Sequence, residues 1–274
     1  MNETPPVTVA MLGPPVARGR TAMIYNWDAD HVLKLFWPDR AVHAVEYEAA
    51  VARKVHATGL PVPAVGSIVT IEGRTGIIYE RVDGTPLLQT LATKPWQMLP
   101  VMQQMATLHA AMHSRPAPTL PAQRDRLTHQ IKHAAPLTPI LRQKALAILE
   151  QLPDDAILCH GDFHPGNVLA SANGPVIIDW NDATHGNPLA DVARTLILLR
   201  FGVRPASPLQ RWATQLALTV MRTTYLRRYQ HLRPVDQRQL QRWQIPIAAA
   251  RLSENVSGEE RYLLRYLERL TTDK

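Results

Sequence analysis

A loop near the middle of the chain brings together the residue types that bind a divalent cation and position a reactive hydroxyl. The run 159–169 reads CHGDFHPGNVL, with Asp162 five positions before Asn167. Asp179 comes ten residues after this run, directly behind the apolar segment 176–178. A carboxylate can orient a hydroxyl and take its proton, and amide and carboxylate oxygens suit Mg²⁺. The set therefore predicts phosphoryl transfer that uses ATP and Mg²⁺.

Two apolar stretches around this loop predict the strands that hold its residues. Segments 168–169 and 176–178 read as the strands of a hairpin, with SANGP at 171–175 as the turn. Asp179 then stands at a strand end. Loops without any chemistry are also rich in His, Gly, Asp, Pro and Asn. The complete string, with a strand and a second Asp behind it, makes that plain interpretation the less favoured one.

These motifs resemble a known family. HGDFHPGN at 160–167, followed by IIDW at 177–180, is similar to the aminoglycoside phosphotransferase and choline kinase-like family, which is related to the protein kinases. The resemblance covers most of the chain, from about Gly13 to about Leu199. It implies an α+β, protein-kinase-like fold of two lobes, with a small β-rich ATP-binding lobe at 1–83. A larger, mainly helical lobe, 84–274, carries catalysis and substrate binding.

The resemblance also implies roles for single residues. Asp162 is expected to be the catalytic base, and Asn167 and Asp179 are expected to hold Mg²⁺. Asp179 is followed by Trp-Asn rather than Phe-Gly, and no Ala-Pro-Glu segment comes later. Without the sequence of an activation segment, a protein substrate is disfavoured, and the expected acceptor is a small molecule.

The amino-terminal part is expected to cover the phosphates of ATP. We predict a strand at Val7–Leu12, a loop at Gly13–Ala22 and a returning strand at Met23–Tyr25. Gly19 lets backbone come close to phosphate. The loop lacks the full Gly-x-Gly-x-x-Gly pattern, so an ordinary hairpin loop fits the same residues about as well.

Lys34 lies in the alternating stretch HVLKLF at 31–36, where a single Lys usually faces solvent. The next segment, 41–58, has apolar residues at helical spacing and contains Glu46 and Glu48. The resemblance implies an ion pair between Lys34 and a glutamate of this helix, with Lys34 reaching the α- and β-phosphates. The position of the GLPVP run at 59–63 favours Glu48, with Glu46 as the alternative. A solvated helix face is the plain interpretation of either residue.

The segment 76–84, GIIYERVDG, reads as an apolar strand that ends in a turn. By resemblance it is the hinge between the lobes. The Glu80 carbonyl and the Val82 amide are then expected to bind adenine, with Tyr79 at the back of the pocket.

The second lobe is predicted to be mainly helical. An apolar face recurs through 95–113, and a helix at 142–152 leads to the central loop. Pro188 marks the start of another helix. In the family, an Asp at the position of Asp191 supports the catalytic loop. Further helical patterns occupy 208–230, 236–253 and 258–271.

Composition agrees with a globular enzyme. The 274 residues are 46% hydrophobic, enough for a large core, and include a single cysteine, which excludes an internal disulfide. No apolar run approaches a membrane span, and the first residues lack the pattern of a secretion signal. We therefore expect a cytoplasmic protein without a membrane partner.

The net charge of +7 raises the question of nucleic acid. Residues 200–274 hold 14 Lys plus Arg against 6 Asp plus Glu. Such a pattern is usually a solvated helical surface, and no nucleic-acid partner is expected. The same excess of positive charge disfavours polycationic acceptors. The alternative to an enzyme is an inactive kinase-like fold that acts as a nucleotide-binding or scaffold module; intact Lys34, Asp162, Asn167 and Asp179 disfavour it.

Overall fold

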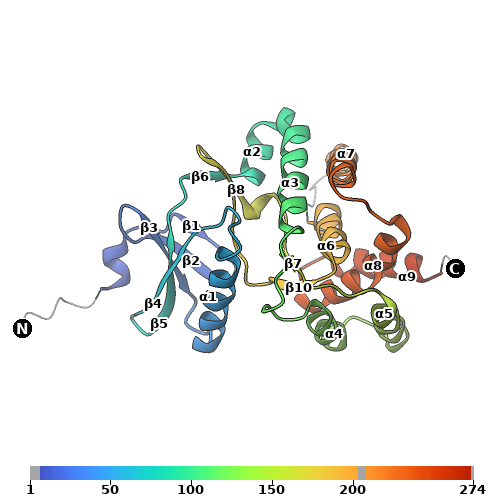
Figure 1. The fold of residues 1–274 in the computed structure, drawn as a ribbon, viewed down its shortest axis with the longest axis horizontal. Coiled ribbons are helices and arrows are strands. Elements are labelled where there is room, and N and C mark those ends of the chain that lie inside the picture. Colours follow the sequence, from blue (N-terminus) through green and yellow to red (C-terminus); the bar gives the residue numbers. More distant parts are fainter. Residues whose placement is uncertain (1–6, 203–207, 273–274) are drawn as a thin grey trace, which may run out of the picture. The chain divides into compact units, whose positions relative to one another are not determined.

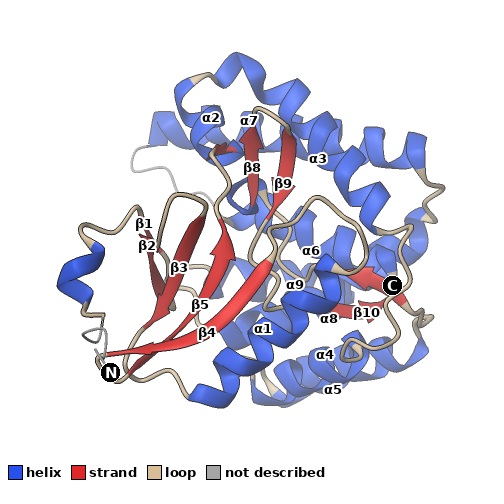
Figure 2. Cartoon of the chain, turned by 60° about the vertical axis from the view of Figure 1, so that its left-hand side comes forward, coloured by secondary structure: helices blue, strands red, loops and turns tan. Residues whose placement is uncertain are grey.

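The computed structural model describes residues 7–202 and 208–272. The chain divides into two compact units, here called unit 1 (Met1–Thr85 and Val168–Asn181) and unit 2 (Pro86–Asn167 and Asp182–Lys274). Unit 1 is rich in strands and unit 2 in helices, so the predicted α+β organisation is confirmed (Figure 2). The segment 168–181 groups with unit 1, whereas a single division of the sequence after Asp83 would place it with the helical part.

Unit 1 is built on a five-stranded sheet with the strand order β1-β2-β3-β5-β4 and antiparallel neighbours. Helix α1 (Val42–His56) packs against β4 and β5, beside the sheet in Figure 1. The strands are β1 (Ala17–Arg18), β2 (Ala22–Asn26), β3 (His31–Phe36), β4 (Val65–Ile71) and β5 (Arg74–Glu80).

The prediction of a strand at Val7–Leu12 is wrong. A 3₁₀ helix, η1 (Val9–Leu12), occupies this segment instead. In a 3₁₀ helix side chains three residues apart share a side, so Val9 and Leu12 both reach the apolar cluster of Tyr25, Leu33, Leu35 and Ile71. A strand would have turned them to opposite faces.

The central hairpin has the predicted form. Strand β8 (Val168–Ser171) pairs with β9 (Gly174–Ile177), and β6 (Gly84–Pro86) borders β8. The register pairs Val168 with Ile177 at the open end. The Ile177 amide also donates to the Pro61 carbonyl at 2.8 Å. This bond links β9 to the segment that follows α1 in the sequence.

Unit 2 is mainly helical, as predicted. Helix α3 packs against α7, and α8 contacts α4, α5, α6 and α9. Among the described helices, none is both long and apolar enough to cross a membrane. The helices are α2 (Leu87–Thr93), α3 (Met98–Met112), α4 (Gln123–His133), α5 (Pro139–Gln151), α6 (Pro188–Phe201), α7 (Pro208–Leu232), α8 (Gln237–Arg251) and α9 (Glu260–Thr272). Shorter elements are η2 (Pro95–Gln97), η3 (Pro165–Asn167), η4 (Leu252–Glu254) and the paired strands β7 (Ile157–Cys159) and β10 (Thr184–Gly186).

Helix α6 starts where its sequence predicts. The Asn187 side chain accepts a hydrogen bond from the Leu189 amide, and Pro188 fills the first helical position. This start places Asp191 in the first turn of α6, next to the loop that follows β7.

Candidate active site

Lys34 is the centre of a charged cluster inside unit 1. Its ammonium lies 2.6 Å from Glu48 Oε1 and 3.0 Å from Asp179 Oδ1. Of the two glutamates considered for this pair, Glu48 is buried on α1, whereas Glu46 is exposed. The structure therefore pairs Lys34 with Glu48.

The charges of this cluster support one another. Burial lowers the pKa of Lys34, but the carboxylates of Asp179 and Glu48 outweigh it and hold that pKa above its usual value. Burial raises the pKa of Glu48, and the charge of Lys34 opposes that rise. Lys34 is therefore a permanent cation on the sheet and could bind an anionic group.

Asp179 has an unusual backbone. Its φ of 63° lies in the left-handed region, which few residues other than glycine adopt. The turn is anchored by the buried Trp180, whose indole Nε1 donates to the Ile177 carbonyl at 3.1 Å. Asp179 therefore leaves the end of β9 in a fixed, strained conformation of the kind found at functional sites.

Asp162 stands in unit 2, in the loop after β7. Arg194 donates to its Oδ1 at 3.2 Å, and His164 Nε2 lies 3.5 Å from Oδ2. Burial raises the pKa of Asp162, but the hydrogen bond from His164 and the charge of Arg194 outweigh it and hold the pKa well below its usual value. The Asn167 side-chain nitrogen donates to the Asp162 carbonyl at 2.9 Å, which links the two ends of the segment 162–167.

Asp191 supports this loop from within unit 2. Its carboxylate accepts from the backbone amides of His160, at 2.6 Å, and Gly161, at 2.9 Å. Gly161 has a φ of 79°, and a Cβ there would meet the Asp182 carbonyl oxygen at 2.5 Å. The glycine of HGD is therefore required by both conformation and space.

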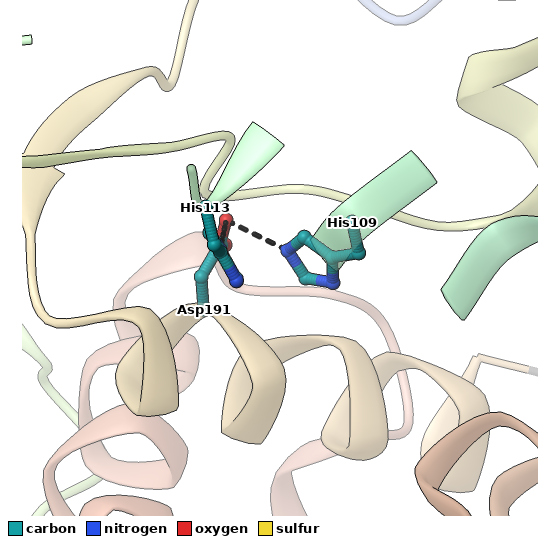
Figure 3. Close-up of side chains that lie close together, drawn as sticks. All are labelled: His109, His113 and Asp191. Carbon is teal, nitrogen blue, oxygen red and sulfur yellow. Dashed lines mark hydrogen bonds and ion pairs between the residues drawn. The ribbon is translucent and has the colours of Figure 1, made fainter. Parts of the chain in front are cut away.

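Two histidines of α3 complete the surroundings of Asp191 (Figure 3). His109 Nε2 lies 3.0 Å and His113 Nε2 3.4 Å from Asp191 Oδ2. Their Nδ1 atoms lie 2.6 Å from the Tyr225 hydroxyl and 2.7 Å from the Tyr229 hydroxyl, respectively. Because an ionised carboxylate only accepts, both Nε2 atoms carry protons, and the tyrosines donate to Nδ1.

This cluster, which has the composition of a metal site, is thus a closed hydrogen-bond network. Each potential ligand nitrogen already has a hydrogen-bond partner. The sequence motifs alone assign no role to His109, His113, Tyr225 or Tyr229. The repeated spacing of four residues in both pairs was the signal that could have found them, since it puts each pair on one helix face.

We expect acid to destabilise the protein through His113. Burial and the charge of His109 lower its pKa to about 3, against 6.5 when unperturbed. Between these values the unfolded chain binds more protons than the folded one, so stability falls as pH falls from about 6.5 towards 3. In urea unfolding, His113→Gln should have a shallower acid slope, and also lower stability at pH 7 by about 1–3 kcal/mol because Tyr229 loses its acceptor. The exposed His56→Gln should follow the unmodified protein, and an unchanged slope in His113→Gln would contradict this assignment.

The other expected ATP-binding residues lie in unit 1. Gly19 sits between β1 and β2, but its amide donates to the Ala22 carbonyl at 2.9 Å, so its contribution near phosphate would be its small size rather than its N–H. Glu80 ends β5, and Val82 follows it. The amides of Glu80 and Arg81 donate to the Ala64 and Asp30 carbonyls, which holds this connection in place.

Comparisons with known proteins agree with this arrangement. The model of one family, described as the phosphotransferase enzyme family, matches residues 15–232. A comparison with curated protein sequences found no match.

Several solved structures have the same fold. A thermostable mutant of the aminoglycoside phosphotransferase APH(4)-Ia, in complex with AMP-PNP and hygromycin B, is 18% identical, with 95% of this chain and 94% of that chain covered and a TM-score of 0.66. The amicoumacin kinase hAmiN, in complex with AMP-PNP, Ca²⁺ and Ami, is 15% identical (93% and 86% covered, TM-score 0.61). The aminoglycoside phosphotransferase APH(3'')-Id from Streptomyces rimosus, in complex with ADP and streptomycin, is 19% identical (86% and 91% covered, TM-score 0.56). These likenesses establish the protein-kinase-like fold.

Proposed function

The chain belongs to the phosphotransferase enzyme family and is an ATP-dependent kinase of a small molecule, and we propose that Asp162 positions the acceptor hydroxyl while Lys34 positions the phosphates. The observation that carries the proposal is the loop of unit 2, in which Asp162 is ionised and held by Arg194 and His164. The pair of Lys34 and Glu48 in unit 1 supports it. A kinase of this kind works where ATP is plentiful, and we place it in the cytoplasm on that ground.

Asp162 is better suited to orientation than to strong base catalysis. Its low pKa keeps the carboxyl group ionised near neutral pH, so it can accept a hydrogen bond from a hydroxyl there. Transfer of a phosphoryl group depends mainly on positioning and on stabilisation of charge. We propose that Asp162 aligns the hydroxyl oxygen with the γ-phosphate. It takes the hydroxyl proton late, as the new P–O bond forms and the bond from the γ-phosphorus to the bridging oxygen breaks to release ADP.

Asn167 and Asp179 fit a Mg²⁺ ion by their chemistry. The Asn167 nitrogen donates to the Asp162 carbonyl, so its amide oxygen is the atom available to a cation. Val168 pairs with Ile177, so Asn167 directly precedes the hairpin in the sequence and Asp179 follows it after one residue. Bound Mg²⁺ would neutralise phosphate charge during the transfer. Asn167 and Asp179 would hold it with oxygen ligands, as Mg²⁺ prefers.

Asp179→Asn should weaken the binding of Mg–ATP as well as turnover. The change removes a charged oxygen ligand and one of the two carboxylates beside Lys34. We expect the dissociation constant for Mg–ATP to rise about tenfold or more, which is about 1.4 kcal/mol. Isothermal titration with Mg–AMP-PNP measures this. Unchanged affinity for the magnesium complex would contradict the assignment of Asp179 as a ligand.

Two carboxylates near the loop of Asp162 support a proposal for the acceptor. Asp182 and Glu254, together with Gly161, Arg126 and Arg194, line part of a small cavity of about 40 Å³ in unit 2. Asp182 is paired with Arg126, and Glu254 is paired with Arg194. A polycation approaching this part of unit 2 would find the charges of these two carboxylates already neutralised. We therefore propose a neutral, singly charged or anionic small molecule as the acceptor.

Polycationic aminoglycosides should be poor substrates. We expect kcat/KM for kanamycin to be at least about 100-fold below that of the best compound in a panel of alcohols, sugars and amino alcohols, since opposite charges that would concentrate a cation are missing. The fully N-acetylated derivative, in which the amines are neutral, is the matched control and should be no worse than kanamycin. A KM for kanamycin in the low micromolar range, about 1–10 μM, with normal turnover would contradict this proposal.

A further inference from the structure

Arg194 of α6 joins the loop of Asp162 to the carboxy-terminal part of unit 2. Its Nε donates to the Gly161 carbonyl at 3.0 Å, and one terminal nitrogen donates to Asp162 Oδ1 at 3.2 Å. The same nitrogen lies 2.7 Å from Glu254 Oε1. The planar guanidinium thus links the backbone of the loop, the carboxylate of Asp162 and a second carboxylate.

Glu254 is held in turn by a second arginine. Arg251, at the end of α8, pairs with Glu254 and contacts Glu259 through two nitrogens, at 2.8 and 3.0 Å. Charges therefore alternate along the row Asp162, Arg194, Glu254, Arg251, Glu259. We call this row the ion-pair row of unit 2.

The ion-pair row is mostly buried. The Arg194 side chain is 8% exposed and that of Glu254 16%. A buried ion that loses its partner is costly, whereas each inner member of this row has a partner on both sides. Such a row fixes the position of Arg194, because a guanidinium free to rotate would not keep three acceptors at once.

The last three members of the ion-pair row lie outside the part of the chain that matches the family. That match ends at residue 232, before Arg251, Glu254 and Glu259. Arg194 lies within it. The support for Arg194 therefore comes from this chain's own carboxy-terminal segment.

We propose that Arg194 is a positioning residue for Asp162 and that Glu254 holds Arg194 in place. Arg194 fixes the Asp162 carboxylate towards the acceptor, and Glu254 prevents the guanidinium from turning away from it. Loss of Glu254 therefore lowers the rate of transfer without weakening ATP binding. This inference rests on the proposed role of Asp162 in the reaction.

The test uses the full chain and water as the acceptor, measured as Mg²⁺-dependent release of phosphate from ATP. We expect Glu254→Gln to lower kcat about tenfold and Arg194→Gln about 100-fold, with KM for ATP within about twofold, since orientation errors act on the transition state. Arg194→Lys should recover only part of the loss, because an ammonium cannot span the three acceptors. The matched control, Glu260→Gln, alters an exposed neighbour and should keep normal kcat.

Two further results separate positioning from simple stability or acceptor binding. Glu259→Gln weakens the ion pair with Arg251 at the end of the ion-pair row. It should therefore lower the melting temperature while reducing kcat less than Glu254→Gln does. Equal losses of kcat in these two variants would reduce the role to stability and overturn the proposal. Normal phosphate release in Glu254→Gln, with a defect only when another acceptor is added, would overturn it in favour of acceptor binding.

The outcome for Asp162→Asn keeps this inference distinct from the proposed function. If that variant releases phosphate normally, the role of Asp162 is wrong and the inference falls with it. If it is inactive while Arg194→Gln and Glu254→Gln are folded and fully active, the proposed function stands. Only the proposal that the ion-pair row positions Asp162 is then overturned.

Discussion

Asp162→Asn should abolish turnover while leaving the binding of ATP nearly intact. The amide is close in shape to the carboxylate but cannot accept the proton of the acceptor hydroxyl, and it loses the charge that holds Arg194 and His164. The variant loses both the orientation of the hydroxyl and the late acceptance of its proton, so we expect kcat to fall about 10²–10⁴-fold. The dissociation constant for Mg–ATP should change less than about threefold, because the proposed role of Asp162 is towards the acceptor rather than the nucleotide.

The matched control for this variant is Asp125→Asn. Asp125 is an exposed acid in the first turn of α4 in the same unit, so its loss tests the effect of one charge on unit 2. It should retain normal kcat. A folded Asp162→Asn protein with more than about a tenth of normal kcat would contradict the assignment of Asp162 to the reaction.

Lys34→Ala and Glu48→Gln should each impair the use of ATP, and their effects should not add. Lys34→Ala removes the cation that we propose binds phosphate, and Glu48→Gln removes the charge of its partner at 2.6 Å. We expect kcat/KM for ATP to fall about 100-fold or more in Lys34→Ala and about tenfold in Glu48→Gln. The double variant should resemble Lys34→Ala, since residues that act as a unit are non-additive.

Stability gives a second readout for the same pair. Lys34→Ala leaves Glu48 buried without its closest cation, which typically costs about 3–5 kcal/mol. The double variant Lys34→Ala with Glu48→Gln should recover part of that loss. Glu46→Gln, on the exposed side of α1, is the control and should behave normally in both assays. If the double variant shows the full product of two independent kinetic defects, Glu48 does not act through Lys34.

The local parts of the site could be predicted from sequence because each depends on neighbouring residues. The hairpin of β8 and β9 was evident from two apolar stretches and a turn between them, and the start of α6 from Pro188. The choice of Glu48 over Glu46 depended on a sequence landmark after the helix. In the structure, α1 buries Glu48 and exposes Glu46.

The long-range contacts could not be predicted in this way. Tyr225 and Tyr229 bond to histidines 116 residues away, and nothing local to α7 indicates those partners. Glu254 likewise has no neighbouring motif, and its importance depends on where the end of α8 meets Arg194. Apolar periodicity also did not distinguish a strand from the 3₁₀ helix at Val9–Leu12, because four residues are too few to set a period.

The most direct test of the central claim follows the γ-phosphate itself. The full chain is incubated with ATP labelled in the γ-phosphate, Mg²⁺ and a panel of small alcohols, amino alcohols, sugars and antibiotics, and the products are weighed by mass spectrometry. We expect at least one compound to gain one labelled phosphoryl group on a hydroxyl, with no product in EDTA or with Asp162→Asn. Tight binding of Mg–ATP without transfer of label to any compound or to water would contradict the account and would instead indicate an inactive nucleotide-binding module.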